Sequence, residues 1–258
     1  MILILIAVLV AFLAVRRHMK TCLNKIIRLF EAGNVCVCGL RGRGKDMLFA
    51  NIIARRAAPY VSNTDYGGQR RRFDPLDFDC GGNTYKNFIS GEITPYVYPF
   101  ADGTDIYISD AGVYFPSQYC SELNKSYGFF STFMALSRHL GSCNVHFNVQ
   151  NLNRVWDKIR EQSDIYVMCN FTKVFGKGRY VLQRVTVYEN YESAVNRVPP
   201  YRSPSVRMNA DRKLTVQMEK QRYRLQYGEI KRYLLFYRNM STYETRVFKY
   251  MLEDGKAY

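Results

Sequence analysis

The chain has 258 residues, of which 47% are hydrophobic, and its formal net charge is +15 at pH 7. This length accommodates one principal domain with an appendage, and the positive charge indicates an anionic partner such as nucleic acid, a nucleotide or a phospholipid surface. The seven cysteines are scattered, contain no C-x-x-C pair and are accompanied by only three histidines. The sequence therefore argues against a disulfide framework and a structural metal, and it indicates a reduced, cytosolic environment.

The first fifteen residues, MILILIAVLVAFLAV, contain no polar side chain and are followed by Arg16, Arg17 and Lys20. At about 1.5 Å per residue this run extends about 22 Å, so a span of the roughly 30 Å hydrocarbon layer would need flanking residues or a thinner bilayer. A cleaved signal peptide would need basic residues before the run and a small-residue cleavage site after it, and neither is present. We expect a single-pass transmembrane anchor at residues 1–20, with the rest of the chain in the cytoplasm because the basic residues follow the span. The alternative is a buried core helix.

The next elements follow in the order strand, glycine loop, helix. Residues 21–33 have apolar side chains at helical spacing and end at Gly33, which predicts a short linker helix. Residues 35–38 form an apolar run typical of a buried strand, and residues 48–53 place apolar side chains on one face of a helix. Between them lies the loop that a phosphate-binding motif requires.

The segment GLRGRGKD, residues 39–46, matches the pattern G-x-x-x-x-G-K-[ST] at Gly39, Gly44 and Lys45 and departs from it at Asp46. In such a loop, backbone N–H groups and the helix dipole surround the phosphate oxygens, and the lysine reaches the β- and γ-phosphates. The alternative is a solvated basic loop. The candidate nucleotide-binding residues are Gly39, Leu40, Arg41, Gly42, Arg43, Gly44, Lys45, Asp46 and Met47.

Further strands and helices alternate along the next hundred residues. We expect a short strand after Pro59, a surface loop at 67–104 with a small helix at 85–89, a strand at 105–110, a long helix at 121–141 and a strand at 144–150. This alternation predicts an α/β fold with a mainly parallel sheet covered by helices on both faces. The strand at 105–110 ends in Asp110, a carboxylate that can hold Mg²⁺ beside a phosphate loop.

From residue 164 the alternation of strands and helices gives way to consecutive β-rich segments. Two β-rich runs flank Gly176-Lys177-Gly178, which predicts an antiparallel hairpin added to the sheet edge. A proline-rich stretch follows, then a helix at 211–227, a strand at 230–237 and a last helix opened by the capping box at 241–244. We divide the chain into an anchor (1–20), an ATPase domain (21–195) and a basic C-terminal extension (196–258).

Four segments together resemble a known family: GLRGRGKD, YISDAGVYFPSQ, SRHLGSCNVHFNVQNLNRVWDKIREQSD and the following hairpin. They are similar to the Zot-like (zonular occludens toxin-like) assembly ATPases of filamentous phages, within the FtsK/HerA-like P-loop ATPases. The resemblance covers about residues 34–190. It implies an inner-membrane motor that hydrolyses ATP with Mg²⁺ and helps to extrude single-stranded DNA while coat subunits assemble.

Transferred by position, the resemblance assigns phosphate binding to Gly39, Gly44 and Lys45, Mg²⁺ to Asp110, and γ-phosphate sensing or water positioning to Gln150. It also implies an arginine that reaches the nucleotide of a neighbouring subunit in a ring. The candidates for that role are Arg138, Arg154 and Arg160. The expected catalytic residues are Lys45, Asp110, Gln150 and Arg160.

Three departures from the family pattern qualify this transfer. Asp46 replaces the usual Ser or Thr, and its carboxylate could bind the metal directly or repel phosphate. Ala111 stands where the family has a glutamate, so the usual water-activating base is absent, with Glu122 as a candidate substitute. The apolar span precedes the ATPase domain, whereas the family generally has it afterwards.

The C-terminal region is basic. Residues 195–258 contain 14 Lys and Arg and 6 Asp and Glu, so their net charge is 14 − 6 = +8, and tyrosines are interleaved with the basic residues. This composition suits either a single-stranded DNA surface or a solvated helix face with tyrosines packed on the sheet, near anionic lipid.

We therefore expect a membrane-anchored P-loop ATPase that acts as a homo-oligomeric motor in filamentous-phage-like virion assembly, DNA packaging or export. ATP and Mg²⁺ are the expected cofactors, and the host inner membrane is the expected location. Phage assembly or coat proteins and single-stranded DNA are the candidate partners. The alternative is a nucleotide-binding membrane scaffold without hydrolysis: Ala111 favours the scaffold, and Lys45 and Gln150 favour the motor.

Overall fold

The computed structural model describes residues 2–56, 58–64, 66, 101–119, 133–135, 137–139, 142–203 and 210–240. The predicted helices at 85–89 and after 241, Glu122 and most of the predicted helix at 121–141 lie outside these residues.

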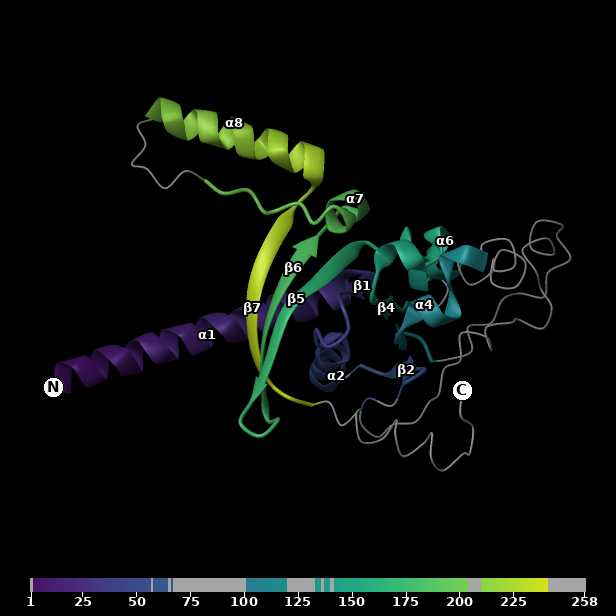
Figure 1. Ribbon diagram of the computed structural model, residues 1–258, viewed down its shortest axis with the longest axis horizontal. Coiled ribbons are helices and arrows are strands. Elements are labelled where there is room, and N and C mark those ends of the chain that lie inside the picture. Colours follow the sequence, from purple (N-terminus) through teal and green to yellow (C-terminus); the bar gives the residue numbers. More distant parts are fainter. Residues whose placement is uncertain are drawn as a thin grey trace, which may run out of the picture.

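The elements that position the site are arranged around one sheet (Figure 1). In chain order they are α1 (Ile2–Ala32), β1 (Val35–Cys38), α2 (Lys45–Arg56), β2 (Tyr60–Ser62), β3 (Asp105–Ile108), α4 (Ala111–Tyr114), β4 (Val145–Val149), α6 (Asp157–Arg160), β5 (Ile165–Phe175), β6 (Tyr180–Tyr188), α7 (Tyr191–Val195), α8 (Ala210–Tyr227) and β7 (Ile230–Arg238). Short 3₁₀ turns lie at Ser117–Tyr119 and Leu152–Arg154.

The sheet has seven strands in the order β2-β3-β4-β1-β5-β6-β7. The strands β2, β3, β4, β1 and β5 are parallel, and β6 and β7 continue the sheet in antiparallel fashion, so the predicted mainly parallel α/β fold is confirmed. The predicted hairpin is present as β5 and β6, but β5 also pairs in parallel with β1, and the edge strand is β7. Residues 230–238 of the predicted C-terminal extension thus belong to the same sheet as the phosphate loop.

Two apolar clusters lie on the opposite faces of this sheet. One contains α1, α2 and the inward side chains of β6 and β7, such as Leu235, and the other contains Phe147, Tyr166 and the single tryptophan, Trp156. Trp156 has no exposed surface, so it acts as a packing residue of the second cluster. Burial of each large side chain contributes about 1.5–3 kcal/mol, so both layers hold the central strands in register.

Helix α1 is continuous over residues 2–32, so the predicted anchor and linker helix form one element. Its C-terminal part packs on the sheet through Leu23, Ile26 and Phe30, and its N-terminal part extends away from the body (Figure 1). Within the described part of the chain, no helix meets the combined length and hydropathy requirements for crossing a bilayer. The transmembrane helix predicted at residues 1–20 is not supported by this finding.

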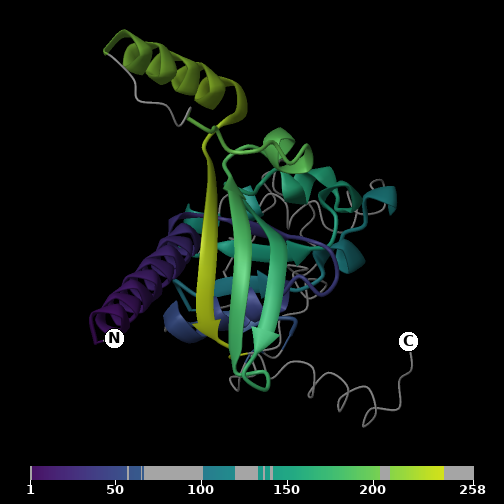
Figure 2. The ribbon, with the colours of Figure 1, turned by 60° about the vertical axis from the view of Figure 1, so that its left-hand side comes forward.

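Helix α8 also stands apart from the body, as Figures 1 and 2 show from two directions. It has no buried residue, and Leu214, Met218 and Leu225 are more than half exposed. The predicted helix at 211–227 and strand at 230–237 are both confirmed within one residue.

Candidate phosphate-binding site

The loop between β1 and α2 has the backbone conformation that a phosphate loop needs. Gly42 and Gly44 have φ of +74° and +72°, in the left-handed region that favours glycine. The loop starts beside the end of β4, where the Gly39 amide donates to the Val149 carbonyl at 3.2 Å. Lys45 then begins α2 and is 6% exposed. The structure therefore gives the predicted order of buried strand, glycine loop and helix N-terminus.

The antiparallel extension holds the back of this loop. Thr172 Oγ1 on β5 and Gln183 Nε2 on β6 both donate to the Arg43 carbonyl, at 2.7 and 2.9 Å, and Gln183 Nε2 also reaches the Gly44 carbonyl at 3.1 Å. The Tyr237 hydroxyl on β7 donates to Gln183 Oε1 at 2.7 Å. These bonds fix the two peptide groups that precede Lys45.

Space behind Gly44 is as restricted as its conformation. A Cβ atom there would lie 2.9 Å from Thr172 Oγ1 and 3.0 Å from Gln183 Nε2, whereas a Cβ at Gly42 would meet no atom of the described residues within 4 Å. Position 44 therefore requires glycine for two reasons, its positive φ and the close approach of β5 and β6. Position 42 requires it only for its positive φ.

Asp46, the residue that departs from the motif, is held by three donors. Asn148 Nδ2, the Tyr66 hydroxyl and Ser109 Oγ donate to its Oδ1 at 2.8, 3.0 and 3.2 Å. The Tyr66 and Ser109 hydroxyl oxygens also lie within hydrogen-bonding distance of each other. Each hydroxyl has a single proton, so a bond between them replaces one of the two bonds to Asp46. The three groups come from separate segments of the chain, and Asp46 Oδ2 takes no part in these bonds.

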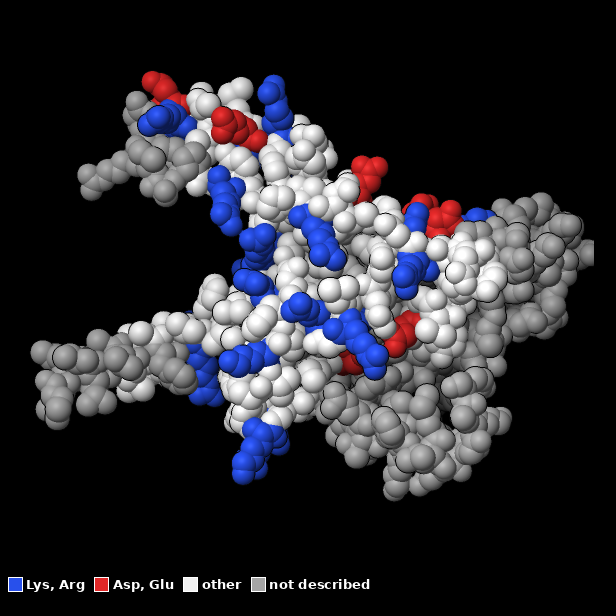
Figure 3. Space-filling view, viewed as in Figure 1, with Lys and Arg blue, Asp and Glu red and all other residues white. Residues whose placement is uncertain are grey.

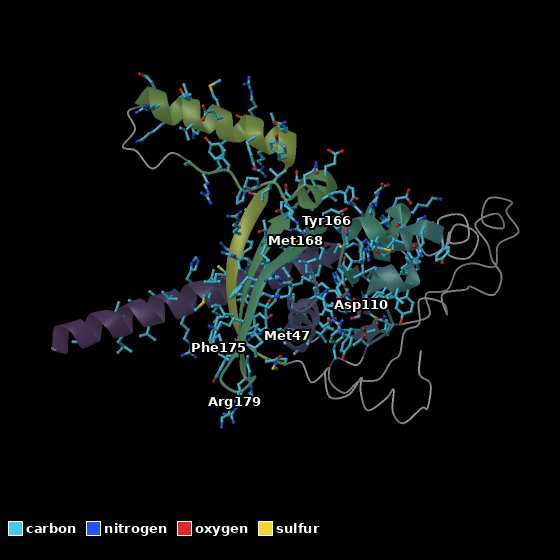
Figure 4. The ribbon with its side chains drawn as sticks, viewed as in Figure 1. Met47, Asp110, Tyr166, Met168, Phe175 and Arg179 are labelled. Carbon is cyan, nitrogen blue, oxygen red and sulfur yellow. The ribbon has the colours of Figure 1, made fainter. Side chains whose placement is uncertain are left out.

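Asp110 follows β3 in a left-handed conformation, with φ 49° and ψ 48°, which is uncommon for a non-glycine residue and frequent at functional sites. Its amide donates to Asn148 Oδ1 at 2.9 Å, so Asn148 joins Asp46 and Asp110. Burial, followed by the charge of Asp46, raises the pKa of Asp110, and Lys45 and a hydrogen bond from Gln150 oppose this shift. The structure therefore brings Lys45, Asp46, Asp110 and Gln150 together. Figure 4 shows Met47 and Asp110 in this part of the molecule.

The strand order explains this convergence. Because β4 lies between β1 and β3, the segment after β4 comes between the phosphate loop and Asp110. Parallel strands present their carboxyl ends at one edge of the sheet, where ligands of open α/β folds bind. Ala111 is fully buried at the start of α4 and provides no base beside Asp110.

The three candidate arginines lie in other surroundings. Arg138 donates to the Ala32 carbonyl at 2.6 Å and pairs with Asp164, so it closes the end of α1. Arg160 lies 4.6 Å from the ring centre of Tyr191, and its buried Nε has no hydrogen-bond partner among the described residues. Arg154 is exposed at the end of a 3₁₀ turn. Within one chain none of them joins the group around Lys45, so a role for any of them requires a neighbouring subunit.

The residues present fit a Mg²⁺-nucleotide. Mg²⁺ commonly takes one or two protein carboxylates and completes its shell with phosphate oxygens and water, and Asp46 and Asp110 are carboxylates of that kind. Among the described residues there is no group of three or more His, Cys, Asp or Glu side chains that could hold a metal alone. A bound metal ion would neutralise phosphate charge, and in this chain Lys45 and the loop amides would orient the phosphates.

Sequence reasoning missed Asn148, Ser109, Tyr66 and Gln183. Two of them stand out in the sequence: Asn148 interrupts an apolar strand, and Gln183 is a polar residue within the hairpin segment VLQRV. In the structure both side chains are fully buried. A buried amide needs hydrogen-bond partners, so each of these positions could have been marked as part of a network. The sequence could not have identified those partners.

No family model matches the sequence, and no curated protein matches it significantly. The structure is similar to the N-terminal domain of zonular occludens toxin from Neisseria meningitidis, with 11% identity over 61% of this chain and 84% of that chain and a TM-score of 0.38. It is also similar to the genome packaging NTPase B204 from Sulfolobus turreted icosahedral virus 2. For the complex with AMP the identity is 13% over 67% of this chain and 98% of that chain, with a TM-score of 0.37, and for the complex with ATP-gammaS it is 14% over 62% and 93%, with a TM-score of 0.34.

Proposed function

We propose that this protein is a membrane-anchored P-loop ATPase that works as an oligomeric motor in filamentous-phage-like virion assembly, DNA packaging or export. The main support is the combination of a glycine loop with two left-handed glycines, Lys45 at a helix N-terminus, and Asp110 with Gln150 at the same sheet edge. A loop that only served as a basic surface would not need buried Lys45 or the bonds that fix its backbone. The resemblance of residues 34–190 to Zot-like assembly ATPases supplies the biological setting of the proposal.

In the proposed reaction the loop amides and Lys45 bind and orient the phosphates. Asp46 and Asp110 would hold a Mg²⁺ ion, which would neutralise phosphate charge. Gln150, which hydrogen-bonds to Asp110, positions the attacking water or senses the terminal phosphate. An arginine from a neighbouring subunit, with Arg160 as the first candidate, would complete the charge stabilisation in the ring.

A second candidate function is a scaffold that binds a nucleotide without turnover. Ala111 favours it, because this buried position supplies no general base next to Asp110. The scaffold and the motor share the phosphate loop and differ in hydrolysis.

The test is Mg²⁺-ATP binding and phosphate release by the full chain in mild detergent, with and without single-stranded DNA. Lys45→Ala should weaken nucleotide binding and abolish turnover, because the lysine interacts with the β- and γ-phosphates. Lys213→Ala on the exposed helix α8 is the matched control and should resemble wild type. Binding that depends on Lys45 without any turnover would support the scaffold, and ATP binding indifferent to Lys45→Ala would refute both functions.

The membrane anchor and the inner-membrane location belong to this proposal. The support is the apolar sequence of residues 1–15 and the large exposure of Leu9, Val10 and Leu13, which lie on the part of α1 that leaves the body. Membrane fractionation and alkaline extraction of the full chain test this part, and recovery in the soluble fraction would refute it.

A further inference from the structure

The antiparallel extension has one face that no described element covers. In paired strands, directly opposite residues share a face, so the face opposite the phosphate loop contains the rows Phe175–Tyr180–Arg238, Lys173–Leu182–Phe236 and Phe171–Arg184–Leu234. The other face contains Thr172, Gln183 and Tyr237 and packs on the loop and α1. We call the first surface the ring face. Figure 2 shows the three long strands side by side.

Three aromatic rings on the ring face are nearly parallel. Phe236 lies 5.7 Å from Phe175 and 5.6 Å from Tyr180 between ring centres, with interplanar angles of 14° and 15°. Phe175 and Tyr180 are 37% and 43% exposed although they belong to regular strands. Rings that are stacked on one another and partly exposed offer apolar contact surface to a flat ligand. Figure 4 shows Phe175 and Arg179 toward the hairpin end of these strands.

Basic side chains are interleaved with the rings. Arg238 is directly opposite Tyr180, and Arg184 is directly opposite Phe171. Residues 165–188 and 230–238 contain seven Lys and Arg and no Asp or Glu. In Figure 3, Lys and Arg side chains follow the strands β5, β6 and β7, and the acidic side chains lie over other parts of the molecule.

The basic side chains placed between the aromatic rings favour one of three possible ligands of this face, which are a lipid surface, a second copy of the chain and a single-stranded nucleic acid. A lipid surface would require the rings to enter an apolar layer, which would bury Arg238 and Arg184 beside them at high cost. A second copy of this chain would need acidic groups opposite the cations, and the ring face itself contains none. A single-stranded nucleic acid offers flat bases for the rings and phosphates for the cations within the same ligand.

We propose that the ring face of β5, β6 and β7 binds single-stranded nucleic acid, with bases stacked on Phe175, Tyr180 and Phe236 and phosphates paired with Lys173, Arg184 and Arg238. The inference deepens the proposed function, on which its biological meaning rests, because it names the surface through which the motor holds its polymer. The phosphate loop is bonded to the opposite face of the same strands through Thr172 and Gln183. A nucleic acid bound on the ring face would thus contact β5 and β6, whose opposite face supports the phosphate loop.

The test measures the binding of a fluorescein-labelled oligothymidylate to the full chain in non-ionic detergent, by anisotropy over a range of salt concentrations. The ring variant, Phe175→Ala with Tyr180→Ala, should weaken binding about 10-fold or more, because each stacked base contributes measurably, and should leave the salt dependence unchanged. The charge variant, Lys173→Gln with Arg184→Gln, should reduce the slope of log K against log salt by about 1.4, since each single-strand phosphate contact contributes about 0.7. Lys213→Gln with Lys220→Gln on α8 removes the same charge elsewhere and should preserve the slope.

Three results would overturn the proposal. The first is that both ring-face variants bind the oligonucleotide as wild type does. The second is that the variants lose only their binding to anionic phospholipid vesicles and keep their oligonucleotide binding. The third is a changed oligomeric state with unchanged oligonucleotide affinity. Fluorescence of the single tryptophan, Trp156, and binding of a fluorescent ATP analogue verify that each variant is folded. Lys45→Ala separates this proposal from the proposed ATPase: retained oligonucleotide binding without ATP supports the ring face whatever the outcome for hydrolysis.

Discussion

Gln183 provides the sharpest test of how the fold holds the phosphate loop. Its side chain is fully buried on β6 and makes three bonds, two as a donor to the Arg43 and Gly44 carbonyls and one as an acceptor from Tyr237. The substitution Gln183→Leu keeps the size of the side chain and removes all three. We expect it to loosen the peptide groups before Lys45 and to weaken nucleotide binding.

The magnitude follows from what each partner loses. The Arg43 carbonyl keeps the bond from Thr172, and the Gly44 carbonyl keeps the bond from the Leu48 amide, so these acceptors stay partly satisfied. The Tyr237 hydroxyl, on a residue that is 2% exposed, loses its acceptor, which costs about 1–3 kcal/mol. With the net loss of the loop bonds, we expect the free energy of unfolding to fall by about 2–3 kcal/mol.

Tyr237→Phe is the control that isolates this contribution. Combined with Gln183→Leu it removes the orphaned hydroxyl, so the double variant should be more stable than Gln183→Leu alone, with a coupling of about 1 kcal/mol or more. The assay is thermal unfolding of the full chain in detergent, followed by the fluorescence of Trp156, together with titration of a fluorescent ATP analogue. Strictly additive losses, or an ATP affinity that Gln183→Leu leaves unchanged, would refute the role of Gln183 in holding the loop.

Two further predictions concern the loop and its carboxylates. Gly44→Ala should abolish nucleotide binding and destabilise the fold, because its Cβ would meet Thr172 Oγ1 at 2.9 Å. Gly42→Ala should lower the free energy of unfolding by only about 1 kcal/mol, the cost of the positive φ for a residue with a side chain. Equal losses for the two variants in melting and binding experiments would contradict the steric explanation. Since the pKa of Asp110 is raised by burial and by Asp46, Mg²⁺-dependent ATP binding should weaken on acidification at a higher pH than for an ordinary aspartate. The sign is fixed by ionisation: Asp110 binds metal as the carboxylate, so binding is present above its pKa and is lost below it. Asp46→Asn should move the transition to lower pH in a calorimetric titration, and a transition that stays in place would exclude Asp46 as a cause of the shift.

The sequence alone determined the local elements of this protein. Short-range patterns specify them: the apolar run before Gly39, the glycines with Lys45, and the carboxylate after the strand at 105–108 all depend on neighbours in the chain. For that reason the phosphate loop, Asp110 and the strand before Gln150 were predictable with their residue numbers. The partner of the strand at 230–238 was not predictable in the same way, because nothing local to that segment indicates which strand it pairs with.

Only the tertiary structure decided which of these elements meet. The position of β4 between β1 and β3 brings Asn148 to Asp46 and Asp110, and the pairing of β7 with β6 brings Tyr237 to Gln183 behind the loop. Gln183 and Arg43 are 140 residues apart, and their contact depends on strand order and register. Register also decides that Phe175, Tyr180 and Phe236 share one face. Strand order and register arise from the packing of the whole core, so a local pattern can identify the residues of a site but not the partners that hold them.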